Sequence, residues 1–521
     1  MDYSLQTGLK STIFNYVGRL TAQIMTLFVS IYIIRKLPIK EFGQYNLLSS
    51  ILSYMLLISS FGISKVVQRY IPEFWKSENN QKIIYLSFFG IIAQLLITVF
   101  FVGVLLVFSS SIGKLIKFPE LQKYLSVYKW VLLINPIVVV LDALLTSLLF
   151  HLVSNLGLIV AWFVRGIGYF YVIQQGDGLY EILIIEVIAV GVRFIFLLVT
   201  FISNILLQWD FRFSGLLNIF NIVDERVRRY GLWSYLSDVS YLFFNTDTDN
   251  FIIANHLGNE SVGRYGFASR IGKMAQKWMP LNIAFNAIVP LFINRYSESK
   301  NENVLNSMFT YLIKISYVFN LPILAGILAM NERLINFVFG EKYINSTWLL
   351  IGILSFTIIN AYETPLGLVV YAIERNQLLV ASRMFSILNL FMGLLLVRVW
   401  GVTGVLLATA VSVSLKNAFI FFMVNKNVKV RIEWIVMVRI AINSIIMGLF
   451  IWLITPLFSD VIYFIISITM GSLIYILLNI LNNTFSSSEL NLVNRAIGRD
   501  VLPNIKKFDL IGKLIEKAND A

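Results

Sequence analysis

The sequence predicts an all-α polytopic membrane protein with about 14 transmembrane helices, each long enough to cross a hydrocarbon core of roughly 30 Å. Hydrophobic residues make up 58% of the 521 residues, and charged residues only 14%. Apolar runs of about twenty residues follow one another from Ser11 to Asn482, with little polar sequence between them. A soluble domain of this size could not bury so much apolar surface.

The predicted spans follow the chain in order. They cover about 11–34, 44–68, 83–108, 124–149, 152–173, 179–206, 230–255, 263–293, 309–330, 345–372, 377–398, 402–424, 435–455 and 461–481. The longest link, about 207–229, is too short to fold as a catalytic domain.

A weak internal repeat indicates two lobes. The motif Gly43-x-Tyr45-x-x-x-Ser49-x-Ile51 recurs as Gly263-x-Tyr265-x-x-x-Ser269-x-Ile271, about 220 residues or six helices later. An even-numbered repeat keeps its orientation, so we expect two six-helix lobes related by an axis along the membrane normal, with the substrate path between them. The predicted parts are an N-terminal lobe (1–206), a cytoplasmic linker (207–229), a C-terminal lobe (230–424), two additional transmembrane helices (425–482) and a basic cytoplasmic tail (483–521).

The formal net charge of +13 reflects topology rather than nucleic-acid binding. Lys and Arg collect in short loops on alternate sides of the spans, with exceptions near 35–40 and 114–123, and the richer side is expected to be cytoplasmic. That side carries Lys65, Arg69, Lys76, Lys82, Arg212, Arg226, Arg228, Arg229, Arg295, Lys300, Lys426, Lys429, Arg431 and the tail. We therefore expect a multi-pass protein of the cytoplasmic (cell) membrane with both termini inside.

Several chemistries are excluded by what the sequence lacks. There is no cysteine, hence no disulfide or thiolate metal site. No phosphate-binding loop of the Walker type occurs, and His151 and His256 stand apart without metal-ligand spacing. We expect no cofactor, no metal and no enzymatic activity, since no large extramembrane loop could hold an acceptor substrate.

Four short motifs carry a resemblance to a known family. They are Ile33 to Gly43-Gln44-Tyr45, Gln68-Arg69-Tyr70-Ile71-Pro72-Glu73, Asp249 to Gly263-Arg264-Tyr265, and Phe339-Gly340-Glu341-Lys342-Tyr343. With these motifs in this order, the chain resembles the polysaccharide-transporter (oligosaccharide flippase, Wzx-like) branch of the multidrug/oligosaccharidyl-lipid/polysaccharide (MOP) exporter superfamily. The resemblance implies two six-helix lobes, alternating access, and export of a polyprenyl-(pyro)phosphate-linked oligosaccharide for surface polysaccharide or glycan assembly.

The predicted eighth span carries a column of basic residues. Arg270, Lys273 and Lys277 are three and four residues apart, so a helix places them on one face over about 10 Å of rise. A charged side chain inside a bilayer is costly and should face a cavity or a partner. The column suits an anionic headgroup such as a pyrophosphate, since Arg binds two oxygens at once and Lys adds a mobile charge. Pairing with acids of the seventh span is the alternative.

The seventh span contains those acids. Asp238, Asn245 and Asp249 are seven and four residues apart and would share one face of a continuous helix, with Asp247 pointing elsewhere. A buried carboxylate in a transporter helix can carry a proton or Na⁺. We predict Asp238 as the better ion-coupling candidate, and a gating pair or charge balance with the eighth span for Asp249.

The first span presents a polar stripe. Asn15, Arg19 and Gln23 are four residues apart, and Thr26 and Ser30 continue the stripe. Such a stripe either lines a polar cavity or joins two helices by hydrogen bonds. The family resemblance favours the cavity, because exporters of this kind often place arginines on their first and eighth helices.

Further charged residues lie inside other predicted spans. Glu186 and Arg193 share a face of the sixth predicted span, and Arg165 lies within the fifth, which indicates an internal ion-pair cluster. No role is assigned from sequence to Asp142, Lys314, Glu363, Arg383 and Lys416.

Two other functions share the scaffold. A cation-coupled multidrug exporter of the same superfamily would have a cavity lined with acids, which the basic column opposes. A peptidoglycan lipid-precursor flippase would fit the span count equally. The expected partners are a lipid-linked oligosaccharide, membrane lipids, H⁺ or Na⁺ as coupling ion, and glycan polymerase machinery, with no nucleic acid.

Overall fold

The computed structural model describes residues 5–77, 79–206, 224–240, 242, 246–279, 296, 301–454 and 460–485. The chain forms two compact units. The first contains Met1–Arg270, Val338–Leu349 and Arg383–Ser412, and the second contains Ile271–Phe337, Leu350–Ser382 and Val413–Ala521.

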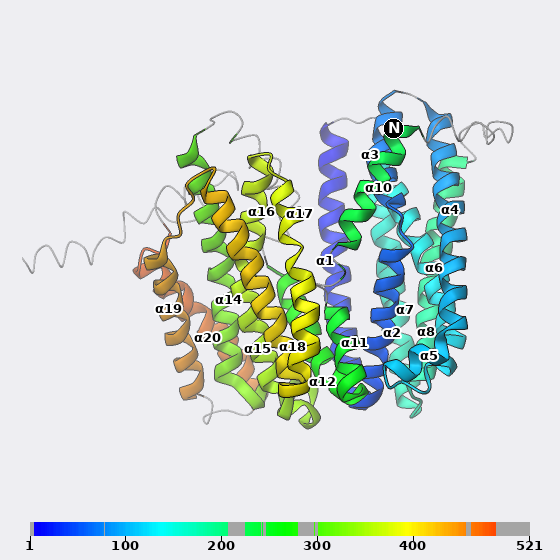
Figure 1. The fold of residues 1–521 in the computed structure, drawn as a ribbon. Helices are drawn as coiled ribbons and strands as arrows, with labels where there is room; N and C mark the ends of the chain where they lie inside the picture. Colours follow the sequence, from blue (N-terminus) through cyan, green and yellow to red (C-terminus); the bar gives the residue numbers. More distant parts are fainter. Residues whose placement is uncertain are drawn as a thin grey trace, which may run out of the picture. The chain divides into compact units, whose positions relative to one another are not determined.

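The first unit is built mainly from the helices of the N-terminal half (Figure 1). In order these are α1 (Leu5–Lys36), α2 (Ile39–Ile58), α3 (Ile63–Lys76), α4 (Asn80–Val107), α5 (Ser109–Leu115), α6 (Leu121–Ser147), α7 (His151–Gln174), α8 (Leu179–Phe201), the π-helix η1 (Ile202–Leu206), α10 (Glu225–Val239), α11 (Thr246–Leu257) and the first part of α12 (Asn259–Lys277). Helix α6 is central, since it packs against α3, α4 and α8, while α7 lies against α1 and α8.

The later helices complete the chain. They are α14 (Glu302–Phe339), the 3-10 helix η4 (Glu341–Ser346), α15 (Thr347–Ile359), the 3-10 helix η5 (Asn360–Tyr362), α16 (Glu363–Ala372), α17 (Gln377–Ser382), α18 (Phe385–Asn425), α19 (Trp434–Ile454) and α20 (Asp460–Leu481). In the second unit, an apolar core joins α14 to α16 and α19 through Phe309, Val369 and Ile440. A second core joins α19 and α20 through Met447 and Tyr463.

The predicted all-α membrane fold is confirmed. In the described part of the chain, 10 helices are long and apolar enough to cross a membrane, or up to 11 if the bent pair α2 and α3 counts as one span. The predicted number is about 14, and the difference has two sources. Helix α18 has 41 residues and a kink at Gly401, so it holds two of the predicted crossings. Helices α10 to α12 are too short or too polar to be counted singly.

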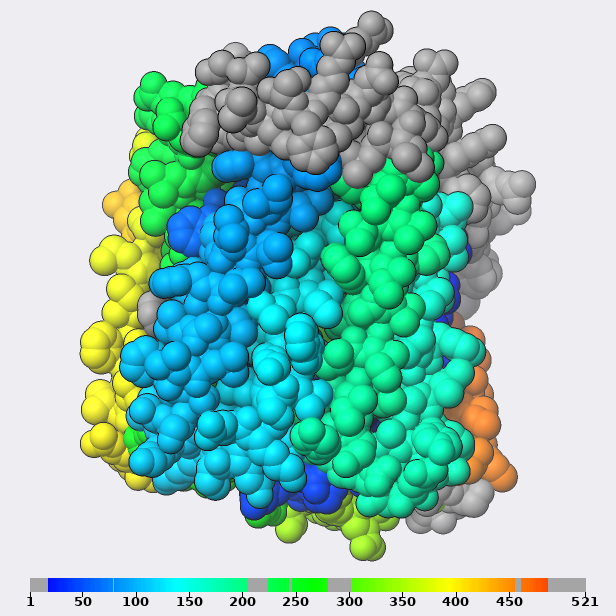
Figure 2. Space-filling model, turned by 90° about the vertical axis from the view of Figure 1, so that its right-hand side faces the viewer, coloured from blue at the N-terminus to red at the C-terminus, as the bar shows by residue number. Residues whose placement is uncertain are grey.

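Helices α4 and α8 of the first unit expose large apolar side chains. Leu96 and Phe100 on α4 are 65% and 64% exposed, and Ile195 and Val199 on α8 are 59% and 58% exposed. Figure 2 shows this face, with α4 in blue and α8 in blue-green. Contiguous apolar surface of this extent is typical of a face in contact with lipid.

Three predicted spans are not single straight α-helices, although the one over 345–372 lies within a stretch, Glu341–Ala372, that is long and apolar enough to cross a membrane. The span predicted over 44–68 bends by 51° between α2 and α3. The one over 230–255 is two helices, because α10 ends at Val239 and α11 begins at Thr246. The one over 345–372 is interrupted by η5. The helix of the eighth predicted span, α12, ends at Lys277. The part of that span after Met279 lies outside the described residues, as does the predicted basic tail after Phe485.

Candidate functional site

The two copies of the repeated motif meet where α2 and α12 cross. A Cβ atom built on Gly43 would lie 1.8 Å from the backbone oxygen of Asn259, and one on Gly263 would lie 2.1 Å from that of Ile39. The contact is reciprocal, because each glycine meets the first residue of the opposite helix. Only glycine permits backbones to approach this closely. The repeated glycines therefore create the junction beside which the polar residues of the first unit gather.

Arg270 lies next to this junction. Its guanidinium is 5.2 Å from the ring centre of Tyr45 and 5.8 Å from that of Phe42, and the residue is half-buried. In the described part of the chain, Arg270 makes no ion pair with a carboxylate. Aromatic faces stabilise a cation without neutralising it. Arg270 is thus held by aromatic rings rather than by a carboxylate among the described residues.

Lys273 and Lys277 follow Arg270 on α12 and are both exposed. The predicted helix over the basic column is therefore present, with Lys277 as its last residue. On α1, Arg19 is exposed and Gln23 is half-buried, while the side chain of Asn15 lies outside the described residues. Thr26 donates to the carbonyl of Ala22 within its own helix.

Glu186 is the centre of a buried hydrogen-bond network that includes Tyr45. It accepts hydrogen bonds from the Tyr45 hydroxyl at 2.8 Å and from Arg165 Nε at 2.9 Å, and also from the Tyr169 hydroxyl. The predicted ion-pair cluster is confirmed for Arg165 and Glu186. Arg193 instead pairs with Asp142 at 3.0 Å, which gives that isolated acid a partner.

Asp249 is the most buried acid among the predicted site residues, with 1% of its surface exposed. The Tyr265 hydroxyl of α12 donates to it at 2.6 Å. Thr409 Oγ1 of α18 lies 3.3 and 3.4 Å from its two carboxylate oxygens and 3.1 Å from Asn389 Oδ1. Hydroxyl oxygens from two helices, α12 and α18, therefore contact one carboxylate on α11, and oxygen atoms are the ligands that hard cations prefer.

Asp238 does not share a face with Asp249, because the helix breaks between them; Asn245 lies outside the described residues. Arg383 Nη1 donates at this break to the Ser237 carbonyl at 2.7 Å and to the Ser240 hydroxyl at 2.7 Å. The last carbonyls of a helix lack partners within the helix, so Arg383 stabilises the end of α10. Asp247 does point elsewhere, as predicted, and accepts from Ser50 of α2 at 2.9 Å.

A polar cavity in the second unit was missed by sequence reasoning. Its volume is about 200 Å³, and its lining includes Ser316, Asn320, Thr357, Asn360, Glu363 and Thr364. Buried Lys416 pairs with Glu363 at 2.6 Å beside it. The cavity lies at the 3-10 break between α15 and α16, where Asn360 and Glu363 line it. Glu363 and Thr364, directly before Pro365 in an apolar run, were the available signal.

Glu363→Ala is expected to lower the free energy of unfolding by about 3 kcal/mol, because it removes the carboxylate that pairs with the buried Lys416 ammonium. The double variant Lys416→Met, Glu363→Gln removes both charges and is expected to regain most of this loss. Unfolding by SDS in mixed micelles measures both. Equal losses in the single and double variants would contradict a buried, interacting pair.

Known structures share this fold. The lipid II flippase MurJ in an inward closed conformation superposes with a TM-score of 0.70 at 16% identity, covering 90% of this chain and 99% of that one. An inward-facing multidrug resistance MATE family transporter of the MOP superfamily superposes with a TM-score of 0.62 at 14% identity, covering 79% of this chain and 97% of that one. At these identities the two likenesses show the fold alone, an all-helical membrane fold that a lipid II flippase and a multidrug transporter share with this chain.

The family follows from the sequence model that matches residues 33–347, more than half of the chain. The chain belongs to the family described as polysaccharide biosynthesis protein. A curated relative, the "Probable low-salt glycan biosynthesis flippase Agl15" of Haloferax volcanii, is 21% identical over 220 residues, which are 42% of this chain and 46% of that protein. The chain thus matches less than half the length of that relative. The proteins to which it is similar are flippases and transporters, not enzymes.

Proposed function

We propose that the chain is a flippase that exports a polyprenyl-(pyro)phosphate-linked oligosaccharide across the cytoplasmic membrane by alternating access, for surface polysaccharide or glycan assembly. The observation that carries the proposal is Arg270, a half-buried cation held by aromatic rings and, in the described part of the chain, without an acidic partner. A cationic drug would be repelled there, whereas a phosphate group would be bound. Membership of the polysaccharide biosynthesis family supports the glycan.

The basic column of α12 would receive the headgroup. Arg270 can bind two phosphate oxygens at once, and Lys273 and Lys277 add mobile charges along the same helix face. Arg19, with Asn15 and Gln23 on the polar stripe of α1, would line the same path. The two predicted lobes, 1–206 and 230–424, would rock about this path, while the polyprenyl chain stays in the surrounding lipid.

The membrane potential favours export of an anion. Moving one net negative charge outward gains about 2.3 kcal/mol per 100 mV of inside-negative potential. Both termini are proposed to be cytoplasmic, which places the basic loops on the side from which the substrate starts. Glycan polymerase machinery is the proposed partner that receives the product.

Asp249 is the proposed coupling residue, in preference to Asp238. One carboxylate in contact with the hydroxyl oxygens of Thr409 and Tyr265, with Asn389 hydrogen-bonded to Thr409 behind it, suits a proton or a monovalent cation. Asp238 lies on the other side of the helix break, on α10, and so does not share this set of oxygens. A gating role for Asp249 would use the same contacts, since protonation changes what the carboxylate can accept.

Asp249→Asn is expected to abolish acceleration of flipping by an imposed H⁺ or Na⁺ gradient and to leave potential-driven flipping measurable. The amide keeps the size of the side chain but cannot change charge. Asp247→Asn is the matched control, because it is buried on the same helix but contacts α2. Gradient-driven flipping in proteoliposomes measures both variants. Full acceleration in Asp249→Asn would exclude this residue from coupling.

The proposed function is tested by flipping of a fluorescent, short-chain polyprenyl-pyrophosphate oligosaccharide in proteoliposomes, with and without an imposed potential. Protein-dependent flipping that steepens with inside-negative potential is expected. The same vesicles are loaded with a peptidoglycan lipid precursor and with a cationic dye. Flipping of the precursor alone would identify a peptidoglycan-precursor flippase, whose fold is similar. Proton-coupled efflux of the dye alone would identify a multidrug exporter.

A further inference from the structure

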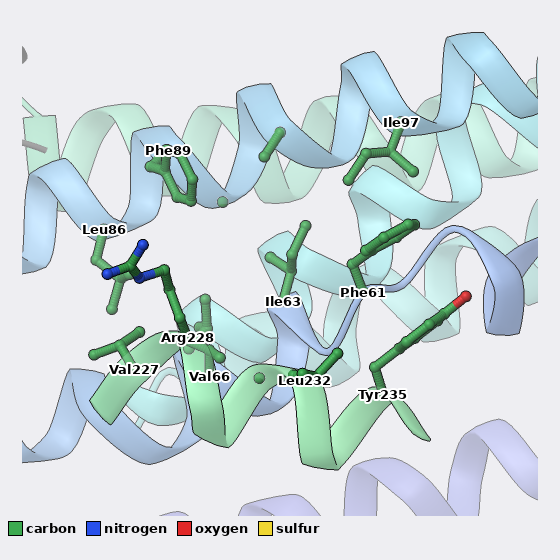
Figure 3. A pocket seen from close by; sticks show the side chains of 14 residues that line it. Phe61, Ile63, Val66, Leu86, Phe89, Ile97, Val227, Arg228, Leu232 and Tyr235 are labelled. Atoms are coloured by element: carbon green, nitrogen blue, oxygen red, sulfur yellow. The ribbon is translucent and has the colours of Figure 1, made fainter. Parts of the chain in front are cut away.

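An apolar groove runs along the first unit between α3, α4 and α10 (Figure 3). Its volume is about 520 Å³, within the range of ligand pockets in proteins. Val67 from α3, Ala93 and Ile97 from α4 and Leu232 from α10 form its walls. Among the described residues that line it, Arg228 alone is charged. The groove is therefore built for a hydrocarbon with one polar end.

Glycines bring the walls of the groove together. A Cβ atom on Gly62 would lie 2.3 Å from the carbonyl oxygen of Gly231, and Gly62 has a φ of +72°. The backbones of α3 and α10 therefore touch at this point, while α4 remains on the opposite wall. At the same end, the rings of Phe61 and Tyr235 stack with centres 4.8 Å apart. This stacked pair closes one end of the groove.

Arg228 lies at the other end, beside Leu86 and Val227 (Figure 3). From Leu86 to Ile97, α4 rises about 16 Å, close to the roughly 15 Å of hydrocarbon in one leaflet. The groove therefore has the length of one leaflet's hydrocarbon and places its cation at one end of it.

The charges around this end favour an anion at Arg228. Arg226 is already paired with Glu73 at 3.0 Å, and Arg69 shares that carboxylate at 3.2 Å. In the described part of the chain, Arg228 has no ion pair. On the other side of α10, an open hollow is lined by Arg69, Tyr70, Glu225, Arg226, Arg229, Tyr230 and Trp233. Tyr and Trp mixed with basic residues mark the headgroup level of a membrane.

We propose that the groove binds an anionic phospholipid of the surrounding bilayer, with one acyl chain along α4 and the phosphate on Arg228. The apolar walls take the chain, and the guanidinium forms charge-assisted hydrogen bonds with phosphate oxygens. The lipid fills the space between α10 and α4 and holds α10 against α3, next to the break that follows Val239. This site does not depend on the proposed function.

Photo-crosslinking tests the site in the full chain. The protein is placed in phosphatidylcholine nanodiscs that contain a trace of phosphatidylglycerol or phosphatidylcholine with a diazirine on one acyl chain. Mass spectrometry then measures the yield on peptides covering 86–97 and 227–235. We expect phosphatidylglycerol to label these peptides about fivefold more than phosphatidylcholine, the preference that one arginine near the surface supplies. Peptides of α19, whose Val438 and Ile445 are exposed, report unspecific labelling and should show no preference.

Three variants sharpen the test. Arg228→Gln is expected to bring phosphatidylglycerol labelling down to that of phosphatidylcholine. Arg229→Gln is the matched control and should keep the preference, because Arg229 lines the hollow on the other side of α10. Ala93→Phe should reduce labelling by both lipids, since the ring occupies the groove. Arg228 is exposed, so its replacement leaves the fold intact even if Ala93→Phe does not.

Three outcomes would overturn the proposal. Equal labelling by the two lipids would show that Arg228 does not bind a lipid phosphate. Groove peptides that are labelled no more than α19 would mean that the groove is closed to lipid, including by another part of this chain. Displacement by unlabelled polyprenyl phosphate at a far lower mole fraction than by unlabelled phosphatidylglycerol would assign the groove to a carrier lipid instead.

Discussion

Gly43→Ala is expected to give little or no folded protein, with a loss of at least ~3 kcal/mol in the free energy of unfolding. The added methyl group would lie 1.8 Å from the backbone oxygen of Asn259. A backbone atom cannot rotate away as the end of a side chain can, so α2 and α12 must separate. Gly263→Ala is expected to act in the same way, because its Cβ meets the Ile39 oxygen. Yield and SDS unfolding measure the effect.

Gly103→Ala is the matched control on α4, where an added Cβ meets nothing within 4 Å. Alanine favours a helix over glycine by about 0.8–1.0 kcal/mol, so this variant is expected to be at least as stable as the parent. Native stability in Gly43→Ala would show that the two helices do not cross at their glycines. The repeat would then have no structural contact of its own.

Arg270→Ala is expected to slow flipping of a polyprenyl-pyrophosphate substrate by about tenfold or more, the worth of a charge-assisted hydrogen bond to an anion. Arg270→Lys should keep part of the activity, because it preserves the charge but loses the two-point contact. The double variant Arg270→Ala, Lys273→Ala should flip still more slowly. Initial rates in proteoliposomes at several substrate concentrations measure the three variants.

Arg264→Ala is the control on the same helix. Arg264 pairs with Glu260 at 2.9 Å on the exposed surface of α12, and a surface pair of this kind contributes about 0–1 kcal/mol. We expect its flipping rate and stability to stay close to those of the parent. Unchanged flipping in the Arg270→Ala, Lys273→Ala variant would refute the anion column, whatever the stability of the protein.

The helices could largely be predicted from the sequence, but their breaks could not. A long apolar run predicts a membrane span. Such a span must be a helix, because an unpaired backbone group is costly anywhere in the bilayer. A break requires partners for the freed backbone groups, and those partners come from distant parts of the chain. Arg383, for example, donates to Ser237 and Ser240 at the end of α10, across more than 140 positions of sequence.

The candidate site could be predicted only in part for a similar reason. The spacing of Arg270, Lys273 and Lys277 needs nothing but a helix, and that helix is present. The roles of the acidic residues were harder to predict. Helical periodicity shows which residues share a face, but not which part of the protein that face contacts. Asp249 meets Thr409 from a helix far along the chain.

The sequence by itself determined that the protein lies in a membrane, that it is helical and to which family it belongs. These conclusions rest on hydrophobicity and motif order summed over many residues, so an error at one position does not change them. Only the tertiary structure decided where helices break, which charges neutralise each other and which cation stays available. These depend on single contacts between helices, such as Arg193 with Asp142 and Arg270 with Tyr45. Moving one side chain by a few ångströms changes an ion pair into a free charge, and no pattern along one chain encodes that distance.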